Sequence, residues 1–496
     1  MDIILAGFNL DYETIKEMKT SLLTEAENFT PETISAAYAR ISRNPLPVNE
    51  LREISRKEVE SARKSNRNIV FDMGHSSIAE HAVFNIDVLG VSRLLVEEIE
   101  KFRLCSYTEK SQRYIRLKDD FVTPEEIKET GLEKLFIETI EEQNRFYQEL
   151  YSRLRSHIFK KFENMASDPA NHSTLEGWAK EDARYTISMA TETQLGMTLN
   201  TRNLELMLRR CAAHPLREVR EYGEKLYETT KNIAPSLVRY TEATRFDSLT
   251  RNALEEKSRW LIEKFGKKEN QTTKAREIDN NVTLFYATPD ADDKIVASLI
   301  HSSSNIPMHQ CTVIVSQMNM KEKEDVIKAS CKYMKSYDPP LREFENADLH
   351  FEVTVSAGCF AQMKRHRMAT ILCQEYNPLL GIIIPPTIRE IGMDALFMEM
   401  IAKTEETYDR IKNISPLAAG YILTNAHRKR VSMKVNAREL YHISRLREDI
   451  HAQWDIRETA KRMVRLGKKV MPLALMLATG KDSFDSLYNQ CYSEET

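Results

Sequence analysis

The alternation of apolar and polar residues predicts short strands, and a slower apolar period predicts longer helices. Residues 82–88 alternate apolar and polar side chains, which is typical of a half-buried strand. Residues 124–165 carry apolar side chains at helical spacing and predict one long helical stretch. Three more apolar runs, at 3–6, 282–286 and 350–356, are strand candidates. Predicted strands and helices therefore alternate along the chain.

Other segments are predicted to be helical or irregular. Helices are expected at 31–43, 91–101, 173–240 and 292–301, with a charged helix ending near residue 70. Residues 74–81 break the helical pattern ahead of the strand at 82–88, and the polar segment 102–114 is expected to be irregular.

The chain changes character between residues 241 and 281. Residues 255–274 are rich in charge, and residues 267–274 include no apolar side chain. We interpret 251–280 as a linker that includes a short helix. A length of 496 residues suits two domains of ordinary size. The predicted domains are therefore residues 1–250 and 281–496.

Composition excludes several classes of protein. A hydrophobic content of 42% and a charged content of 29% are typical of a soluble globular protein. The net charge of −3 gives no general attraction to nucleic acid or anionic membrane, and no apolar run is long enough for a membrane span. The seven cysteines form no CxxC pair, and the histidines show no metal-binding spacing. We expect a cytoplasmic protein without a metal site.

A cationic stretch after the strand at 350–356 is the first candidate for chemistry. Lys364, Arg365, His366 and Arg367 are consecutive, and Gln362 precedes them. Four neighbouring side chains cannot all lie on one face of a helix or strand. Some of them must point inward, where an unpaired charge is costly. An anionic ligand or an acidic partner is therefore expected, although a solvated basic turn would explain the cluster if it stood alone.

The two halves of the chain resemble degenerate copies of each other. Motifs recur in the same order and at nearly constant spacing. The matched pairs are Val91-Ser-Arg93 with Val355-Ser-Ala357, Ala183-Arg-Tyr185 with Ala419-Gly-Tyr421, and Asn200-Thr-Arg202 with Asn436-Ala-Arg438. Several ordered matches favour an internal duplication over chance.

These motifs resemble those of the flavin-dependent thymidylate synthases. In the first half the resemblance rests on Gly74-His-x-Ser-x-x-Glu-His81, Val91-Ser-Arg93 and Ser106-Tyr-Thr-Glu-Lys-Ser-Gln-Arg-Tyr114. In the second half it rests on Gln362-x-x-Arg-His-Arg367, Asn436-Ala-Arg438, Leu446-Arg447 and His451-Ala-Gln453. The resemblance implies an α+β fold in two copies, each a mostly antiparallel sheet flanked by helices. It also implies reductive methylation of dUMP to dTMP, with methylene-tetrahydrofolate, NADPH and FAD.

The resemblance also implies site residues from both halves. The nucleotide would be bound by Glu109, Ser111, Gln112, Arg113, Arg184, Gln362, Arg365 and Arg447. FAD would be bound by His75, Ser77, Glu80, His366, Arg367, Asn436, Arg438 and His442, the last where the family usually has asparagine. Arg447, Arg365 and Ser111 would act directly on the substrate, with Ser111 as a hydrogen-bond donor rather than a nucleophile. No metal ligand is implied.

Neither half matches the family pattern completely. In the first half the basic triplet is Lys101-Phe-Arg103 and its preceding glutamine is Glu98. In the second half the arginine kept as Arg184 becomes Gly420, and the serine-arginine loop becomes residues 373–377. The Gly-His…Glu-His pattern survives at best at 303–309, beside an apparent insertion at 318–348. Family members are homotetramers, so we expect a homodimer of fused pairs with two good composite sites.

Two alternatives remain open for the function. One is a related flavoenzyme that acts on another pyrimidine nucleotide. The other is a non-catalytic nucleotide-binding or scaffold protein. The motif Asn436-Ala-Arg438 and the residue Arg113 also have plainer explanations, as a strand-to-helix cap and as a surface ion pair.

Overall fold

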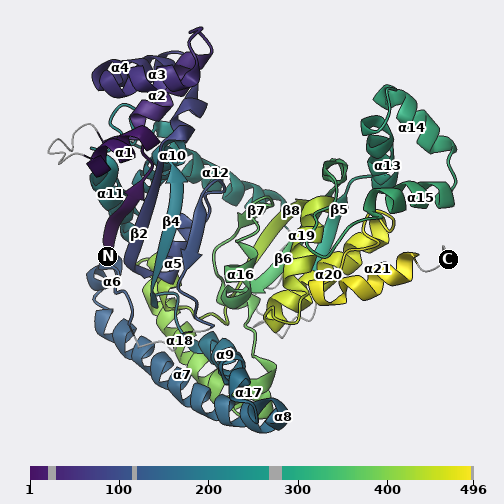
Figure 1. The fold of residues 1–496 in the computed structure, drawn as a ribbon. Coiled ribbons are helices and arrows are strands. Elements are labelled where there is room, and N and C mark those ends of the chain that lie inside the picture. The colour runs from purple at the N-terminus through teal and green to yellow at the C-terminus, as the bar shows by residue number, and fades with distance from the viewer. Residues whose placement is uncertain (21–28, 114, 116–119, 267–281, 493–496) are drawn as a thin grey trace. The chain divides into compact units, whose positions relative to one another are not determined.

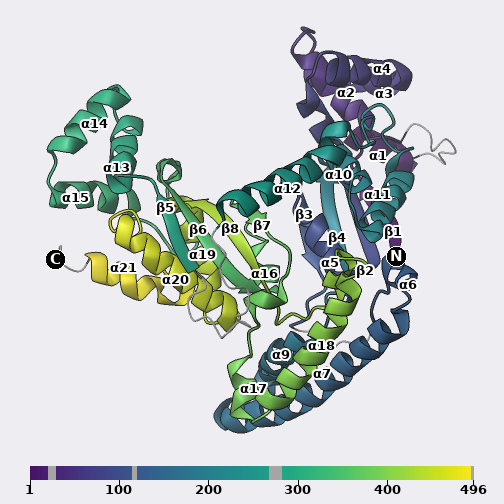
Figure 2. The same cartoon turned by 180° about the vertical axis from the view of Figure 1, so that it is seen from behind.

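The protein contains two four-stranded antiparallel sheets with the same topology, one in each of two units (Figures 1 and 2). The structure, a computed structural model, describes residues 1–20, 29–113, 115, 120–266 and 282–492. The strand orders are β1-β2-β4-β3 and β5-β6-β8-β7, and every pairing is antiparallel. The predicted two-copy α+β fold is confirmed. No helix in the described ranges is long and apolar enough to cross a membrane.

The chain divides into two compact units, each with one sheet. Unit 1 comprises Met1–Phe146, Ile187–Gln271 and Met400–Ile422. Its strands are β1 (Asp2–Phe8), β2 (Val83–Ser92), β3 (Ser106–Glu109) and β4 (Glu192–Asn200). Its helices are α1 (Tyr12–Thr20), α2 (Glu32–Ile41), α3 (Val48–Lys57), α4 (Val59–Arg67), α5 (Arg93–Ile99), α6 (Glu125–Glu129), α10 (Thr201–Ala212), α11 (Arg217–Thr230) and α12 (Arg245–Phe265).

Unit 2 repeats this plan around the second sheet. It comprises Tyr147–Thr186, Thr272–Glu399 and Leu423–Thr496. Its strands are β5 (Val282–Ala287), β6 (Asp348–Ser356), β7 (Thr370–Cys373) and β8 (Arg428–Asn436). Its helices are α8 (Glu163–Ala166), α9 (His172–Ala183), α13 (Ala291–Ser302), α14 (Met308–Gln317), α15 (Met320–Cys331), α16 (Ala357–Met363), α17 (Pro386–Glu390), α19 (Ala437–Arg447), α20 (Trp454–Val470) and α21 (Phe484–Tyr492). Helices α7 (Glu133–Lys161) and α18 (Asp394–Lys412) contribute to both units.

The core of unit 2 lies between its sheet and the helices α19 and α20, which cover one face of that sheet in Figure 1. Alternate residues of β6 and β8, such as Phe351, Val353 and Met433, are fully or almost fully buried against residues of these helices, such as Leu440 and Met463. Burying large apolar side chains in this way supplies the main driving force for folding.

The two sequence halves exchange one segment each. Residues 147–186 of the first half belong to the unit of the second sheet, and residues 400–422 of the second half belong to the unit of the first sheet. Equivalent backbone hydrogen bonds hold the two exchanged segments: Ala190 N donates to the Tyr421 carbonyl at 2.9 Å, and Ala426 N donates to the Tyr185 carbonyl at 3.1 Å. The compact units therefore do not coincide with the predicted domains 1–250 and 281–496. Those boundaries describe the two copies in the sequence, and they stay a prediction.

In unit 1 a buried carboxylate fixes the exchanged segment. Glu218 Oε2 accepts hydrogen bonds from Ser92 Oγ at 2.6 Å and from Tyr421 Oη at 2.7 Å. Ser92 also caps α5, since its Oγ accepts from Leu95 N at 3.0 Å. Burial raises the pKa of Glu218 above its ordinary value. One carboxylate thus ties together the end of β2, helix α11 and the exchanged segment.

Unit 2 builds the same triad from equivalent positions. Asp455 Oδ2 accepts from Ser356 Oγ at 2.6 Å and from Tyr185 Oη at 2.9 Å. Ser356 caps α16 through Cys359 N at 3.0 Å. Burial raises the pKa of Asp455 as well. Each Ser–carboxylate–Tyr triad therefore joins its sheet to a segment from the other half of the sequence.

The sequence prediction missed four strands of the described residues: β3, β4, β7 and β8. Residues 173–240 were expected to be helical throughout, but β4 lies within them as an inner strand of the first sheet. Its side chains alternate: Thr193, Leu195, Met197 and Leu199 are buried. This period of two was present in the sequence but was obscured by leucine, methionine and glutamine, which favour helices. Likewise β3 lies in the segment predicted to be irregular.

The second-half counterpart of the motif at 74–81 was misplaced. In unit 1 that motif forms a short 3₁₀ turn, Ser76–His81, directly before β2; in unit 2 the 3₁₀ turn Arg342–Asn346 directly precedes β6. In each turn a glutamate pairs with an arginine near the start of a later helix: Glu80 pairs with Arg202 of α10, and Glu345 pairs with Arg438 of α19. The counterpart is therefore at 342–346 and not at 303–309. Since α13, α14 and α15 repeat α2, α3 and α4, residues 318–348 are not an insertion.

The predicted linker is helical over much of its described part. Helix α12 extends to Phe265 and starts with a capping box between Thr244 and Asp247. The uninterrupted polar stretch at 267–274 lies outside the described residues.

Replacing Tyr421 or Tyr185 by phenylalanine is expected to lower the stability of its unit by about 1–3 kcal/mol, because a buried carboxylate loses a donor. Urea unfolding of the full chain should show a transition at lower denaturant concentration for either variant. The control is Tyr333→Phe, since Tyr333 is 83% exposed. Unchanged midpoints for both buried variants would refute the role of the triads.

Candidate functional site

The basic stretch after α16 divides into buried and exposed side chains. Gln362, Lys364 and His366 are buried, whereas Arg365 and Arg367 are exposed. This alternation confirms that the four consecutive cationic positions do not share one face. The two guanidiniums lie at the surface of unit 2, where Arg365 Nε donates to the Ala361 carbonyl at 3.3 Å, and the other side chains point into its interior.

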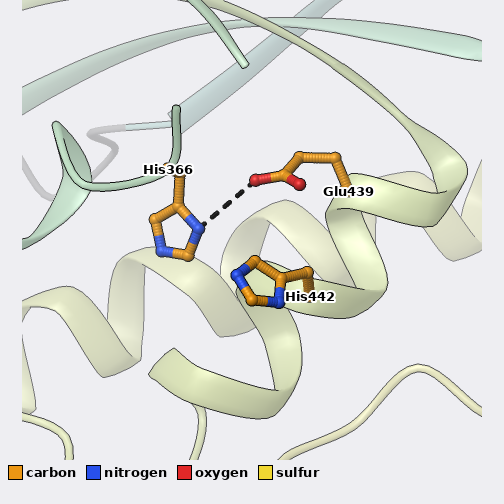
Figure 3. Close-up of side chains that lie close together, drawn as sticks. All are labelled: His366, Glu439 and His442. Atoms are coloured by element: carbon orange, nitrogen blue, oxygen red, sulfur yellow. Dashed lines mark ion pairs between the residues drawn. The ribbon is translucent and has the colours of Figure 1, made fainter. Parts of the chain in front are cut away.

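His366 joins the basic stretch to helix α19. Arg447 Nε donates a hydrogen bond to His366 Nε2 at 2.9 Å, and Glu439 Oε1 lies 3.4 Å from His366 Nδ1 (Figure 3). Burial and the neighbouring Arg447 charge lower the pKa of His366 to about 3. The imidazole is therefore neutral at pH 7. Because Nε2 accepts from Arg447, the ring proton is assigned to Nδ1, facing the Glu439 carboxylate.

A second histidine completes this cluster. His442 lies one helical turn after Glu439 on α19, and its ring meets that of His366 edge-on with centroids 5.5 Å apart. Figure 3 shows His366, Glu439 and His442 pointing toward a common centre. His442 is exposed while its two neighbours are buried, so the cluster lies at the surface of unit 2. Its donor atoms are of the kinds that metal ions and polar cofactors bind.

Arg184 and Gln362 meet on one side-chain carbonyl. Gln453 Oε1 accepts from Arg184 Nη2 at 2.9 Å and from Gln362 Nε2 at 2.7 Å, and Gln453 Nε2 donates to Tyr185 Oη at 2.7 Å. All of these side chains are buried. Tyr185 belongs to the Asp455 triad, so the exchanged segment carries Arg184 to this place. The structure thus brings together two predicted nucleotide-binding residues from opposite halves of the sequence.

The space beside the exchanged segment is filled differently in the two units. In unit 2, Arg184 Nη2 lies 3.5 Å from the carbonyl oxygen of Gly358, and a Cβ added to Gly358 would be only 3.1 Å from the Tyr185 ring. Glycine is therefore needed for close approach of the exchanged segment. In unit 1 the counterpart of Gly358 is Leu94, whose side chain packs 3.7 Å from the Cβ position of Gly420, the counterpart of Arg184. In each unit, therefore, a glycine packs against a large side chain: Gly358 against Tyr185 of the exchanged segment in unit 2, and Gly420 of the exchanged segment against Leu94 in unit 1.

The predicted nucleotide loop follows β3 in unit 1. Ser111 Oγ accepts from Arg113 N at 3.2 Å, and Lys110 N donates to the Gln194 carbonyl at 2.9 Å. Gln112 is buried, and its Oε1 accepts from Arg93 Nη1 at 2.7 Å. Gln112 therefore points inward and anchors the loop. Glu109, Ser111 and Arg113 are half-buried, and their binding of a nucleotide stays a prediction.

The predicted flavin residues occupy varied environments. His75 and Ser77 are exposed in unit 1, and Glu80 pairs with Arg202. Asn436 caps α19, since its Oδ1 accepts from Glu439 N at 2.8 Å. Arg438 pairs with Glu345 at 3.1 Å and donates to the Pro340 carbonyl at 2.8 Å. Asn436 and Arg438 thus have structural partners in unit 2, and binding of FAD by these residues stays a prediction.

Two residues that join the candidate site residues to one another were not singled out from the sequence. Gln453 lies inside the His451-Ala-Gln453 motif but had no predicted role, and Glu439 lies beside the Asn436-Ala-Arg438 motif. Helical spacing places Glu439 and His442 on one face of α19, which was a usable signal. The meeting of Gln453 with Arg184 had no local signal.

Comparisons with known proteins agree with the duplication. The family described as thymidylate synthase complementing protein matches the chain twice, over residues 23–236 and 283–473. A flavin-dependent thymidylate synthase of Clostridium tetani is 30% identical over 228 residues, which make up 45% of this chain and 86% of that protein. A UPF0159 protein of Chlamydia pneumoniae is 23% identical over 436 residues, covering 84% of this chain and 80% of that protein.

One solved structure also resembles part of the chain. It is a flavin-dependent thymidylate synthase from Helicobacter pylori complexed with FAD and dUMP, with 16% identity and a TM-score of 0.33 over 49% of this chain and 100% of its own. The family assignment rests instead on the two matches to the family and on the relative from Clostridium tetani. Since those two matches cover most of the sequence, the chain belongs to the thymidylate synthase complementing protein family, that of the flavin-dependent thymidylate synthases, and carries two copies of its domain.

Proposed function

We propose that the protein catalyses the FAD-dependent reductive methylation of dUMP to dTMP, with methylene-tetrahydrofolate as carbon donor and NADPH as reductant. The observation that carries the proposal is the meeting of Arg184 and Gln362 on Gln453. A guanidinium from one sequence copy and the signature glutamine from the other are thereby held together, as a composite nucleotide site requires. Membership of the family supports the reaction, and the triads explain how the composite is maintained.

Arg184 and Arg447 are the proposed anchors for the nucleotide. Guanidinium groups bind phosphate and carbonyl oxygens through paired hydrogen bonds. Arg184 would bind the phosphate, and Gln453 fixes one of its terminal nitrogens in advance. Arg447 would hold the uracil and stabilise negative charge that develops on its carbonyl oxygen. Its hydrogen bond to neutral His366 orients the guanidinium without adding a second positive charge at that position.

The residues near His366 fit FAD. Arg367 is an exposed guanidinium suited to an anionic diphosphate, Arg365 would bridge the nucleotide and the flavin, and His442 offers an exposed imidazole. When bound, FAD supplies the hydride-transfer chemistry that protein side chains lack. The task of this chain is then to position the reacting groups and to exclude water. In unit 2 we assign Arg367, His366 and His442 to FAD ahead of Asn436 and Arg438, which already have structural partners.

We propose two active sites in a homodimer of the chain. Four family domains are then present, as in the homotetramers that the resemblance implies. The sites of unit 2 contain Arg184. The equivalent sites of unit 1, at Gly420 and Leu94, lack this arginine. Leu94 fills that place in unit 1, which supports a division of labour between the copies.

Arg365→Ala is expected to weaken dUMP binding by about 10- to 100-fold, because a charged hydrogen-bond donor to the ligand is lost. The measurement is a dUMP titration of the flavin-loaded full-length protein, followed by the visible flavin spectrum. The matched control is Lys101→Ala at the equivalent position of the first copy, where Lys101 pairs with Glu98. Equal losses from both changes would contradict the division of labour.

The wild-type titration tests the reaction itself. A flavin band that shifts with dUMP, together with dTMP formation, is the expected result. A flavin band indifferent to dUMP would favour an enzyme of another pyrimidine nucleotide. Protein that takes up no flavin after soaking with FAD would favour a non-catalytic scaffold.

Arg93→Ala is expected to loosen the loop that contains Ser111 and Arg113, because Gln112 loses its buried partner. Amide hydrogen exchange at Lys110 and Arg113 should quicken by about 10- to 100-fold, the equivalent of one charged hydrogen bond. The KM for dUMP should rise more than kcat falls, and Arg93→Lys should restore part of the loss. Unaltered exchange in this loop would refute the positioning role, whatever the substrate.

A further inference from the structure

The cluster of His366, Glu439 and His442 has the geometry of an ion site. One donor atom from each residue lies within 4.8 Å of the others. Glu439 and His442 are one turn apart on α19, and His366 reaches them from the turn after α16 (Figure 3). His366 is 3% exposed and Glu439 is 8% exposed, while His442 opens to solvent. The fold thus holds His366 and Glu439 in place, and the exposed His442 lies where an ion could enter from solvent.

The donor set selects a class of ion. Two imidazoles and one carboxylate form the set that binds Zn²⁺ in several hydrolases and Fe²⁺ in non-haem oxygenases. Mg²⁺ and Ca²⁺ prefer oxygen donors and fit poorly here. We propose that His366, Glu439 and His442 bind one divalent first-row transition-metal ion per chain, of the Zn²⁺ and Co²⁺ class, with further positions open to solvent or ligand. The proposed reaction does not require this ion, and because the proposed function assigns His366 and His442 to FAD, the ion and the flavin would compete for these side chains.

Binding through His366 changes the role of its other nitrogen. Nδ1 faces Glu439 and is the atom available to the ion, whereas Nε2 accepts from Arg447 Nε at 2.9 Å. An imidazole that gives its Nδ1 lone pair to a metal carries its proton on Nε2. That N–H would then face the N–H of Arg447, and two donors cannot share a hydrogen bond. The ring proton moves from Nδ1 to Nε2, with no net release, and Arg447 must turn away.

The ion and the Arg447–His366 hydrogen bond therefore exclude each other. Arg447 also opposes the ion by its positive charge, while the Glu439 carboxylate favours it. Metal occupation would release the guanidinium that the proposed function assigns to the uracil. The cluster thus couples the occupancy of an ion site to the placement of a substrate-binding arginine.

The first copy provides an internal comparison. The positions equivalent to His366, Glu439 and His442 are Phe102, Asn203 and Leu206. None of these side chains is a good metal ligand. The proposal therefore predicts one site per chain, and the first copy supplies the residues for matched substitutions.

The test is a Co²⁺ titration of untagged, full-length protein freed of flavin and metal, followed by visible d–d absorption and by calorimetry with Zn²⁺. We expect one equivalent per chain. His442→Leu and Glu439→Asn should weaken binding by about 100-fold or more, since a ligand is lost. His309→Gln, an exposed histidine of α14, is the control and should leave binding unchanged.

The substitution Arg447→Met tests the proposal in the opposite direction, because it is expected to strengthen metal binding. It removes a competing donor and a like charge, so metal affinity should rise by about 10-fold or more. Circular dichroism would confirm that each variant is folded. Absence of the Co²⁺ spectrum in wild type, or equal affinity in His442→Leu and Arg447→Met, would overturn the proposal. These measurements require no enzymatic turnover, so failure of the metal proposal can be distinguished from failure of the proposed synthase function.

Discussion

Two buried carboxylates set the organisation of this protein. Glu218 and Asp455 each accept hydrogen bonds from a helix-capping serine and from a tyrosine of the exchanged segment. A buried carboxylate without donors is costly, so the sheet, the capped helix and the exchanged segment must come together for either group to be satisfied. Because both copies use the same three positions, the exchange is reciprocal. It is a property of the duplicated fold rather than an accident of one half.

The asymmetry between the copies follows from what accompanies each tyrosine. Tyr185 brings Arg184 beside Gly358, whereas Tyr421 brings Gly420 beside Leu94. Each combination fills its space, but only one delivers a guanidinium to Gln453 and Gln362. Core packing depends on total volume and shape, so the two solutions are both acceptable to the fold. Packing therefore does not dictate which unit contains the arginine, and its presence in unit 2 alone is consistent with a functional role.

Local patterns predicted much of the fold but little of the site's assembly. The strand at 82–88 alternates clearly, and β2 occupies Val83–Ser92. The strand β4 alternates as well, but its residue types favour helices, and its partner strands β2 and β3 are distant in sequence. The motifs of the resemblance pointed to Gln362 and Arg447, and the internal repeat at Ala183-Arg-Tyr185 contains Arg184. The contact of Arg184 with Gln453 spans the two copies, and no local period encodes such a contact.

The absence of metal-binding spacing in the sequence has a similar explanation. His366 and the pair Glu439 and His442 come from elements far apart in the chain, so a search for local spacing cannot join them. What decides the chemistry of this cluster is the position of one proton on His366. With the proton on Nδ1 the imidazole accepts from Arg447, and with the proton on Nε2 it can bind an ion through Nδ1. Since the neutral ring has one proton for two nitrogens, the same side chain can orient the arginine or hold a metal, but cannot do both at once.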